Sequence, residues 1–180
     1  MLPHLYDSSP KVHRLTSVSD TQTEALADLL IDCIEGGASV SFMHPLSREK
    51  AFAFWRDVAA GVARGERALI VSQDDAGIIT GTVQLILAQP DNQPHRADLA
   101  KMLVHRRARR QGLGDALMQA AESVARECGK TLLVLDTASL DAERLYARNG
   151  WTRVGAIPGY ALLPQGGLCD TTYFYKVLAD

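Results

Sequence analysis

The residues with the clearest chemical potential lie in one short segment, in which arginines and glycines follow each other closely. The segment runs from Val104 to Asp115 and reads VHRRARRQGLGD. Arginine fills four of the five positions from 106 to 110, although the chain has a net charge of −2. Glycines let a backbone approach an anion, and the first N–H groups of a helix can bind one. If a strand ends and a helix begins here, the segment would cradle a pyrophosphate.

Familiar nucleotide motifs do not fit this segment. It contains neither the G-x-G-x-x-G pattern of dinucleotide-binding folds nor the G-x-x-x-x-G-K-[ST] phosphate loop. The arginines could also form a solvated face, with the glycines merely turning the chain. From the residues alone, both interpretations stay open.

The surrounding hydrophobic periodicity predicts the elements that must position this segment. Strands are predicted at Lys11–Leu15, Arg67–Ser72, Ile78–Ala88, Ala97–Val104, Thr131–Asp136, Trp151–Gly155 and Thr171–Leu178. Helices are predicted from Asp20 to Gly36, after Ser47, from Gly112 to Gly129, and from Ala142 to Asn149. A loop with Pro158-Gly159 and Gly166-Gly167 is expected between the last two strands.

The order β-α-α-β-β-β-α-β-α-β-β predicts a single α/β (α+β) domain. Its central sheet should be mixed and flanked by helices, because a strand–helix–strand unit from Ala97 to Asp136 makes a right-handed crossover between parallel strands. The domain is expected to span residues 1–180, with the N-terminal residues, up to about residue 10, loosely attached.

Two segments resemble a known family. Arg109-x-x-Gly112-x-Gly114 follows Met102-Leu103-Val104 and resembles the [QR]-x-x-G-x-[GA] signature of the GCN5-related N-acetyltransferases (GNAT). The segment from Ala142 to Trp151, AERLYARNGW, resembles the family's A-x-x-[LF]-Y-x-x-x-G-[FW] segment, and the order of elements is the family's order. The resemblance implies the acyl-CoA N-acyltransferase fold and an enzyme that uses acetyl-coenzyme A (acetyl-CoA).

The same resemblance implies which residues bind acetyl-CoA. Strand residues Met102, Leu103 and Val104 would pair with its pantetheine arm, and the turn would bind its pyrophosphate. The turn residues are Arg109, Arg110, Gln111, Gly112, Leu113, Gly114 and Asp115. Ser139 stands where the family often has Asn, so a coenzyme contact there should be weaker or differently made.

Acetyl transfer to an amine also needs groups that move protons. The family's tyrosine matches Tyr146, which would protonate the departing sulfur. Many members place a glutamate base where this chain has Asp98. Asp136 is a second candidate base, because it closes a buried strand at the carboxyl edge of the sheet, where ligands of α/β folds bind. It could equally cap the turn that follows.

A closer resemblance lies near residues 36–43 and 153–160, which are similar to segments of the tabtoxin resistance acetyltransferases, a group acting on a small β-lactam toxin. It implies an amine or hydroxyl of a small molecule as acceptor, and direct transfer in a ternary complex. Ser39, Ser41 and Tyr160 would contact the acceptor, or simply pack in loops. Acetylation of a protein N-terminus or lysine, and a non-catalytic acyl-CoA-binding module, are the alternatives.

The composition of the chain limits the classes of protein, partner and cellular location that remain. The chain is 47% hydrophobic and 22% charged, typical of a globular domain, and its slight negative charge disfavours nucleic acid as a partner. No apolar stretch approaches the ~20 residues of a membrane span. Three scattered cysteines and the absence of a secretory signal indicate a cytoplasmic protein. The histidines are isolated, so no metal is expected, and a homodimer is left open.

Overall fold

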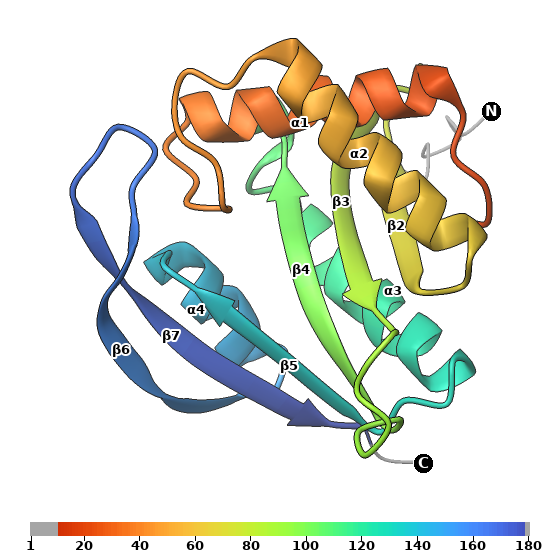
Figure 1. The fold of residues 1–180 in the computed structure, drawn as a ribbon, viewed down its shortest axis with the longest axis vertical. Coiled ribbons are helices and arrows are strands. Elements are labelled where there is room, and N and C mark those ends of the chain that lie inside the picture. Colours follow the sequence, from red (N-terminus) through yellow and green to blue (C-terminus); the bar gives the residue numbers. More distant parts are fainter. Residues whose placement is uncertain (1–10, 179–180) are drawn as a thin grey trace, which may run out of the picture.

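The computed structural model describes residues 11–178, which form one mixed β-sheet with helices on both faces (Figure 1). The N-terminal residues up to about residue 10, which were predicted to be loosely attached, lie outside the described part of the chain. Over residues 11–178, the sheet has seven strands in the order β1-β2-β3-β4-β5-β7-β6. The predicted mixed sheet and its order of elements are therefore confirmed.

The elements have the following bounds. The strands are β1 (Lys11–Leu15), β2 (Arg67–Gln73), β3 (Ile79–Ile86), β4 (Arg96–Val104), β5 (Leu132–Thr137), β6 (Thr152–Leu162) and β7 (Leu168–Val177). The α-helices are α1 (Asp20–Glu35), α2 (Arg48–Ala63), α3 (Leu113–Glu127) and α4 (Leu140–Arg148), and a short 3-10 helix (Arg106–Ala108) precedes α3. Only β4 and β5 pair in parallel among the described strands, as the crossover between them predicts.

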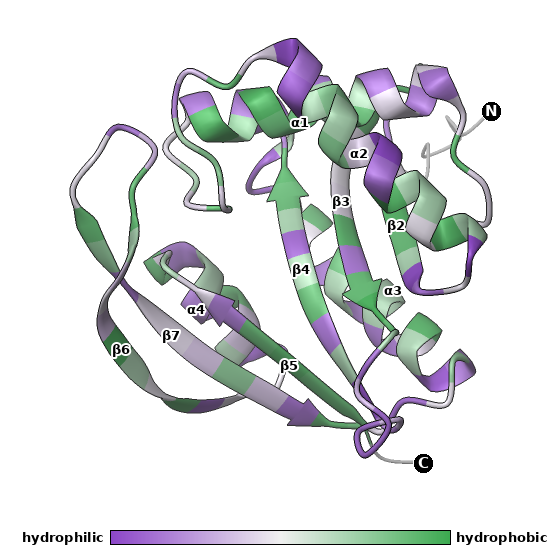
Figure 2. Ribbon diagram, in the orientation of Figure 1, coloured by the Kyte–Doolittle hydropathy of each residue, from purple (hydrophilic) through white to green (hydrophobic). Residues whose placement is uncertain are grey.

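Two hydrophobic cores hold the helices against the sheet. One lies under α1 and α2 and includes Trp55 and Leu69, which are fully buried. The other lies under α3 and α4 and includes Leu117 and Leu133. In Figure 2, β5 is apolar along most of its length and hydrophilic at its carboxyl end, where the chain leaves the core. The polar side chains at the carboxyl end of β5 are therefore available to contact a ligand.

The last hairpin is longer than the sequence indicates. Pro158-Gly159 lies within β6 rather than in a loop, and only residues 163–167 connect β6 to β7. A proline fits because β6 is an edge strand, where no neighbour needs its missing N–H. The pairing with β7 shifts register between Ile157 and Ala161, which absorbs the Pro-Gly pair.

Strand β4 contains a bulge that decides which side chains reach the site. Thr82 and Gln84 of β3 face Leu103 and Ala100, so β4 holds one residue more than its partner. Lys101 has a φ of 52° there, in the left-handed region that non-glycine residues rarely adopt. Leu99 and Leu103 consequently pack in opposite cores, although four residues would put them on one face of a regular strand.

Candidate active site

A cleft of about 780 Å³ opens where β4 and β5 part. The two strands pair only at residues 96–98 of β4, so the rest of the β4 edge has no strand partner on that side. The cleft is lined by the loop after α1, by residues 99–104, by the turn before α3, and by the carboxyl end of β5 with α4. The β4 edge that was predicted to pair with a pantetheine arm, Met102 to Val104, lies in its wall.

The amino end of α3 has the form of an anion site. Gly112 occupies the N-cap with a φ of 76°, and in the described chain no side chain caps this helix. Its first N–H groups therefore face the cleft without a protein acceptor. A Cβ on Gly114 would lie 3.2 Å from the side chain of Leu145, so this glycine permits close packing of α3 on α4. These features fit the pyrophosphate of a coenzyme.

The four arginines of the turn divide into two pairs. Arg106 Nε donates to Asp32 at 2.8 Å, and Arg107 donates to Asp74 at 3.3 Å, so both are tied to distant acidic residues. Arg109 and Arg110 line the cleft instead. Acidic partners far away in the sequence therefore engage Arg106 and Arg107. Arg109 and Arg110 are the two arginines predicted to bind the pyrophosphate, and that role stays a prediction.

Tyr146 projects from α4 into the cleft wall. It is 4% exposed and packs against the rings of Trp151 and Phe174. Burial raises the pKa of its hydroxyl, and the negative charge of Asp136 raises it further. Within residues 11–178 the hydroxyl has no hydrogen-bond partner. The group therefore stays protonated at neutral pH and is free to donate.

The two candidate bases lie on one face of the sheet in different settings. Asp136 is exposed at the end of β5, lines the cleft, and accepts a hydrogen bond from Thr171 Oγ1 at 2.7 Å. Asp98 is an ion-pair partner of Arg96 and does not line the cleft. The hydrogen bond between the hydroxyls of Tyr173 and Tyr160, burial, and the negative charges of Asp136 and Asp98 raise the pKa of Tyr173 to about 12. The geometry favours Asp136.

The comparison with protein families decides the assignment. The sequence model of the acetyltransferase (GNAT) family matches residues 24–151, which include the turn, the cleft strands and Tyr146. The chain belongs to the acetyltransferase (GNAT) family. It is accordingly an N-acetyltransferase that uses acetyl-CoA.

Solved structures of other acetyltransferases share the fold. The yncA protein of Salmonella typhimurium, solved with its cofactor acetyl-CoA, has a TM-score of 0.76 and 20% identity, with 96% of each chain covered. A phosphinothricin acetyltransferase from Sinorhizobium meliloti, in complex with acetyl-CoA, has a TM-score of 0.77 and 13% identity over 94% of this chain and 89% of that one. The ribosomal-protein-alanine N-acetyltransferase of Brucella melitensis has a TM-score of 0.76 and 18% identity over 93% and 99%.

Several residues of this GNAT enzyme that were predicted to bind the coenzyme make hydrogen bonds within the protein. Asp115 accepts hydrogen bonds from Arg148 at 2.8 and 2.9 Å, which lower the pKa of its carboxyl and tie α3 to α4. Gln111 Nε2 donates to the carbonyl of Arg107. Ser139 accepts the N–H of Ala142 and caps α4, which explains why the helix begins before Ala142. Asp115 and Ser139 still line the cleft.

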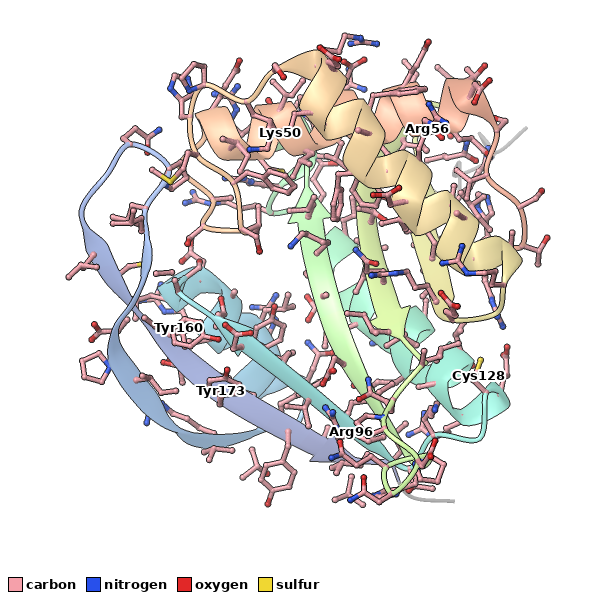
Figure 3. All side chains as sticks on the ribbon, viewed as in Figure 1. Lys50, Arg56, Arg96, Cys128, Tyr160 and Tyr173 are labelled. Carbon is pink, nitrogen blue, oxygen red and sulfur yellow. The ribbon has the colours of Figure 1, made fainter. Side chains whose placement is uncertain are left out.

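The predicted acceptor contacts lie between the loop after α1 and the β6–β7 hairpin. Ser39 is 3.7 Å from Cys169 Sγ, and Ser41 accepts a hydrogen bond from Lys101 at 3.1 Å. Tyr160 and Tyr173, whose hydroxyls are 3.1 Å apart, lie side by side on the hairpin (Figure 3). Ser39 lines the cleft, whereas Tyr160 lies on the hairpin that borders it.

Lys101 is the site residue that the sequence prediction missed. It lines the cleft from the β4 bulge, and burial lowers the pKa of its ammonium group. The sequence carries no clear signal for it, because in a regular strand Lys101 would lie on the face opposite to Asp98. The bulge that changes its face is seen only in the pairing of β4 with β3.

Other reactive groups of the described chain have ordinary roles. Cys33 lines the cleft but is buried, and burial raises the pKa of its thiol to about 11, so it is a poor nucleophile. All three cysteines are unpaired. Residues 11–178 contain no group of three or more His, Cys, Asp or Glu placed to hold a metal, and no helix among them is long and apolar enough to cross a membrane.

Proposed function

We propose that this enzyme acetylates the amine or hydroxyl of a small molecule by direct transfer in a ternary complex. The observation that carries the proposal is a pair of contacts that bridge the acceptor side of the cleft. His44 N–H donates to the carbonyl of Pro164 at 2.9 Å, and Ser39 Oγ donates to the carbonyl of Leu162 at 3.5 Å.

These contacts join the loop after α1 to the β6–β7 loop, and the two loops lie next to each other in Figure 1. A bridged entrance favours a compact acceptor over an extended peptide, which would need an open groove across the sheet. The runner-up, a protein N-terminus or lysine, would require the bridge to open.

The residues of the cleft fit the acetyl donor. Arg109, Arg110 and the N–H groups after Gly112 would hold the pyrophosphate, and the unpaired β4 edge would align the pantetheine arm. When bound, acetyl-CoA supplies the acetyl group as a thioester. Acceptor atoms would reach it from the side of Asp136.

Asp136 would take the proton that an ammonium acceptor must lose. The freed amine then attacks the thioester carbon, a C–N bond forms and the C–S bond breaks, and the second proton of the nitrogen replaces the one that Tyr146 gives to the sulfur. The hydrogen bond from Thr171 engages one oxygen of this carboxylate, and Asp136 lines the cleft. Asp98, paired with Arg96 at the closed end of the strands, would act at most through its charge.

Tyr146 would donate its proton to the departing sulfur. The raised pKa of its hydroxyl suits this role, since the proton is present at neutral pH. The interaction strengthens only as negative charge grows on sulfur, so it stabilises the transition state rather than the bound thioester.

The identity of the acceptor, the location of the protein and its oligomeric state are further parts of the proposal. The resemblance to tabtoxin resistance acetyltransferases supports a toxin or antibiotic-like acceptor. Three unpaired cysteines support a reducing, cytoplasmic setting. A homodimer stays a prediction that sedimentation can check.

An acceptor screen tests the proposal. Amino acids, β-lactam dipeptides, polyamines and peptides would be offered with acetyl-CoA while free thiol is measured. We expect turnover with one of the small molecules. Turnover confined to peptides would overturn the small-molecule assignment in favour of a protein acetyltransferase, and acetyl-CoA binding without turnover on any acceptor would favour a non-catalytic module.

A further inference from the structure

The ammonium group of Lys101 is held in an aromatic setting at the acceptor side of the cleft. Its Nζ lies 5.5 Å from the ring centroid of Phe54 and 5.9 Å from that of Phe42. The two rings meet edge to face at 5.2 Å. Contacts of this kind hold a cation in place without neutralising it.

The hydrogen-bonding capacity of Lys101 is largely unused. An ammonium group has three donors, and within residues 11–178 only Ser41 Oγ accepts one, at 3.1 Å. The side chain is half-buried, and this burial lowers the pKa of its ammonium group. A partly desolvated cation with free donors and no anionic partner is unfavourable, and an anion supplied by a ligand would stabilise it.

Asp136 is the carboxylate whose charge acts on Lys101, since it raises the pKa that burial lowers. The two side chains line the same cleft but do not form an ion pair with each other. A ligand that fits between them would place a negative group at Lys101 and a positive group at Asp136. An amine next to a carboxylate has this arrangement of charges.

We propose that Lys101 binds the carboxylate of the acceptor, and that the acceptor is therefore an amino-acid-type molecule whose ammonium group faces Asp136. This inference rests on the proposed function, because it assumes that the amine at Asp136 is the group acetylated. The strained backbone at Lys101 supports it, because strain of this kind is retained where a side chain must be aimed at a ligand.

Lys50 provides a matched control. Its Nζ also lies 5.9 Å from the Phe42 ring, but it belongs to the first turn of α2 and does not line the cleft (Figure 3). Lys50→Met removes a cation from the same ring without touching the acceptor side. Lys101→Met keeps the length of the stem and the backbone strain, and Lys101→Arg keeps the charge.

The experiment measures kcat/KM for a panel of α-amino acids and for their α-carboxamides, which lack the negative charge, at saturating acetyl-CoA. We expect the wild-type enzyme to prefer acids. In Lys101→Met the ratio of acid to amide should fall about tenfold or more, the amount that a charge-assisted hydrogen bond contributes. Lys101→Arg and Lys50→Met should keep the preference, and the loss should appear in KM rather than in kcat.

Other outcomes overturn the inference. Equal use of acids and amides by the wild-type enzyme would do so, as would an equal loss on both by Lys101→Met, or turnover with amines that include no amino acid. In each of these cases acetyl transfer itself would still be seen. If calorimetry instead detects no binding of acetyl-CoA to any variant, or no amine is acetylated, the proposed function fails and the inference with it.

Discussion

Tyr146 is buried at the wall of the cleft, and its hydroxyl has a raised pKa and no hydrogen-bond partner among the described residues. Replacing it by Phe removes one oxygen and leaves the ring contacts with Trp151 and Phe174 in place. We expect Tyr146→Phe to lower the single-turnover rate by about 10²-fold or more, the usual contribution of a positioned acid, with acetyl-CoA affinity nearly unchanged. A wild-type single-turnover rate in the folded variant would show that Tyr146 only packs.

The raised pKa of Tyr146 also has a consequence for stability. An unfolded tyrosine loses its proton near pH 10, whereas the buried one holds it to higher pH. The unfolded state then binds fewer protons, so the free energy of unfolding is undiminished below pH 10 and falls as the pH rises above it, by at most about 1.4 kcal/mol per pH unit for this group. Urea titrations at pH 9 to 11 should show a shallower decline in Tyr146→Phe than in the wild-type protein.

Asp136 is expected to act as a base, and its effect should depend on pH. Asp136→Asn keeps the acceptor of the Thr171 hydrogen bond but cannot take a proton. The rate with an amine should fall most at neutral pH and recover at high pH, where free amine is abundant. Asp98→Asn serves as the comparison, because its carboxylate is engaged by Arg96. If Asp98→Asn loses the neutral-pH rate and Asp136→Asn does not, the assignment of the base is reversed.

At the scale of elements, the start of α3 explains why Gly112 is required. A side chain there would be strained at a φ of 76° and would project into the open space of the cleft beside the uncapped end of α3. Gly129, at the far end of the same helix, has a φ of 71° and nothing within 4 Å of a built Cβ, as is true of Gly112. Gly112→Val and Gly129→Val should therefore cost similar stability, about 1–2 kcal/mol each.

Of the two variants, only Gly112→Val should bind acetyl-CoA more weakly than the wild-type protein, by about tenfold or ~1.4 kcal/mol in calorimetry. Equal affinities of the two variants would mean that the amino end of α3 is not the pyrophosphate site.

The elements also show what the sequence could and could not predict. The place of Arg109, Gly112, Gly114 and Tyr146 along the cleft was predictable because their signals are local: a strand end, a helix start, and spacing along one helix. The roles of Arg106 and Arg107 were not, because they depend on Asp32 and Asp74, which lie far away in the sequence. The extent of β6 through Pro158 depends on its place at the sheet edge, which periodicity does not reveal.

The bulge in β4 sets a further limit. One extra residue moves every following side chain to the other face, so Lys101 could be assigned to the cleft only once the pairing with β3 was known. The place where β4 separates from β5 could not be predicted from the sequence either. It follows from three paired positions at one end of the strands, and no residue type marks where the pairing stops.

At the scale of the whole molecule, the acceptor side of the cleft is closed by two loops that are far apart in the sequence. The loop after α1 meets the β6–β7 hairpin at Ser39, His44 and Pro164. Ser39 Oγ lies 3.7 Å from Cys169 Sγ, close enough for a second thiol at position 39 to approach the first. The remaining cysteines do not interfere, because Cys33 is buried and Cys128 lies on the far side of the sheet, near α3.

Ser39→Cys should form a disulfide with Cys169 under mild oxidation, which locks the bridge between the loops. If the acceptor is a small molecule that enters beside this bridge, the oxidised variant should keep acetyl-CoA binding and acetylate its acceptor at a rate close to that of the reduced form. The comparison is internal, since a reductant restores the open state of the same sample, and mass spectrometry measures the cross-linked fraction. A peptide acceptor would need the loops to separate, so loss of turnover on oxidation, reversed by the reductant, would assign this cleft to an extended substrate instead.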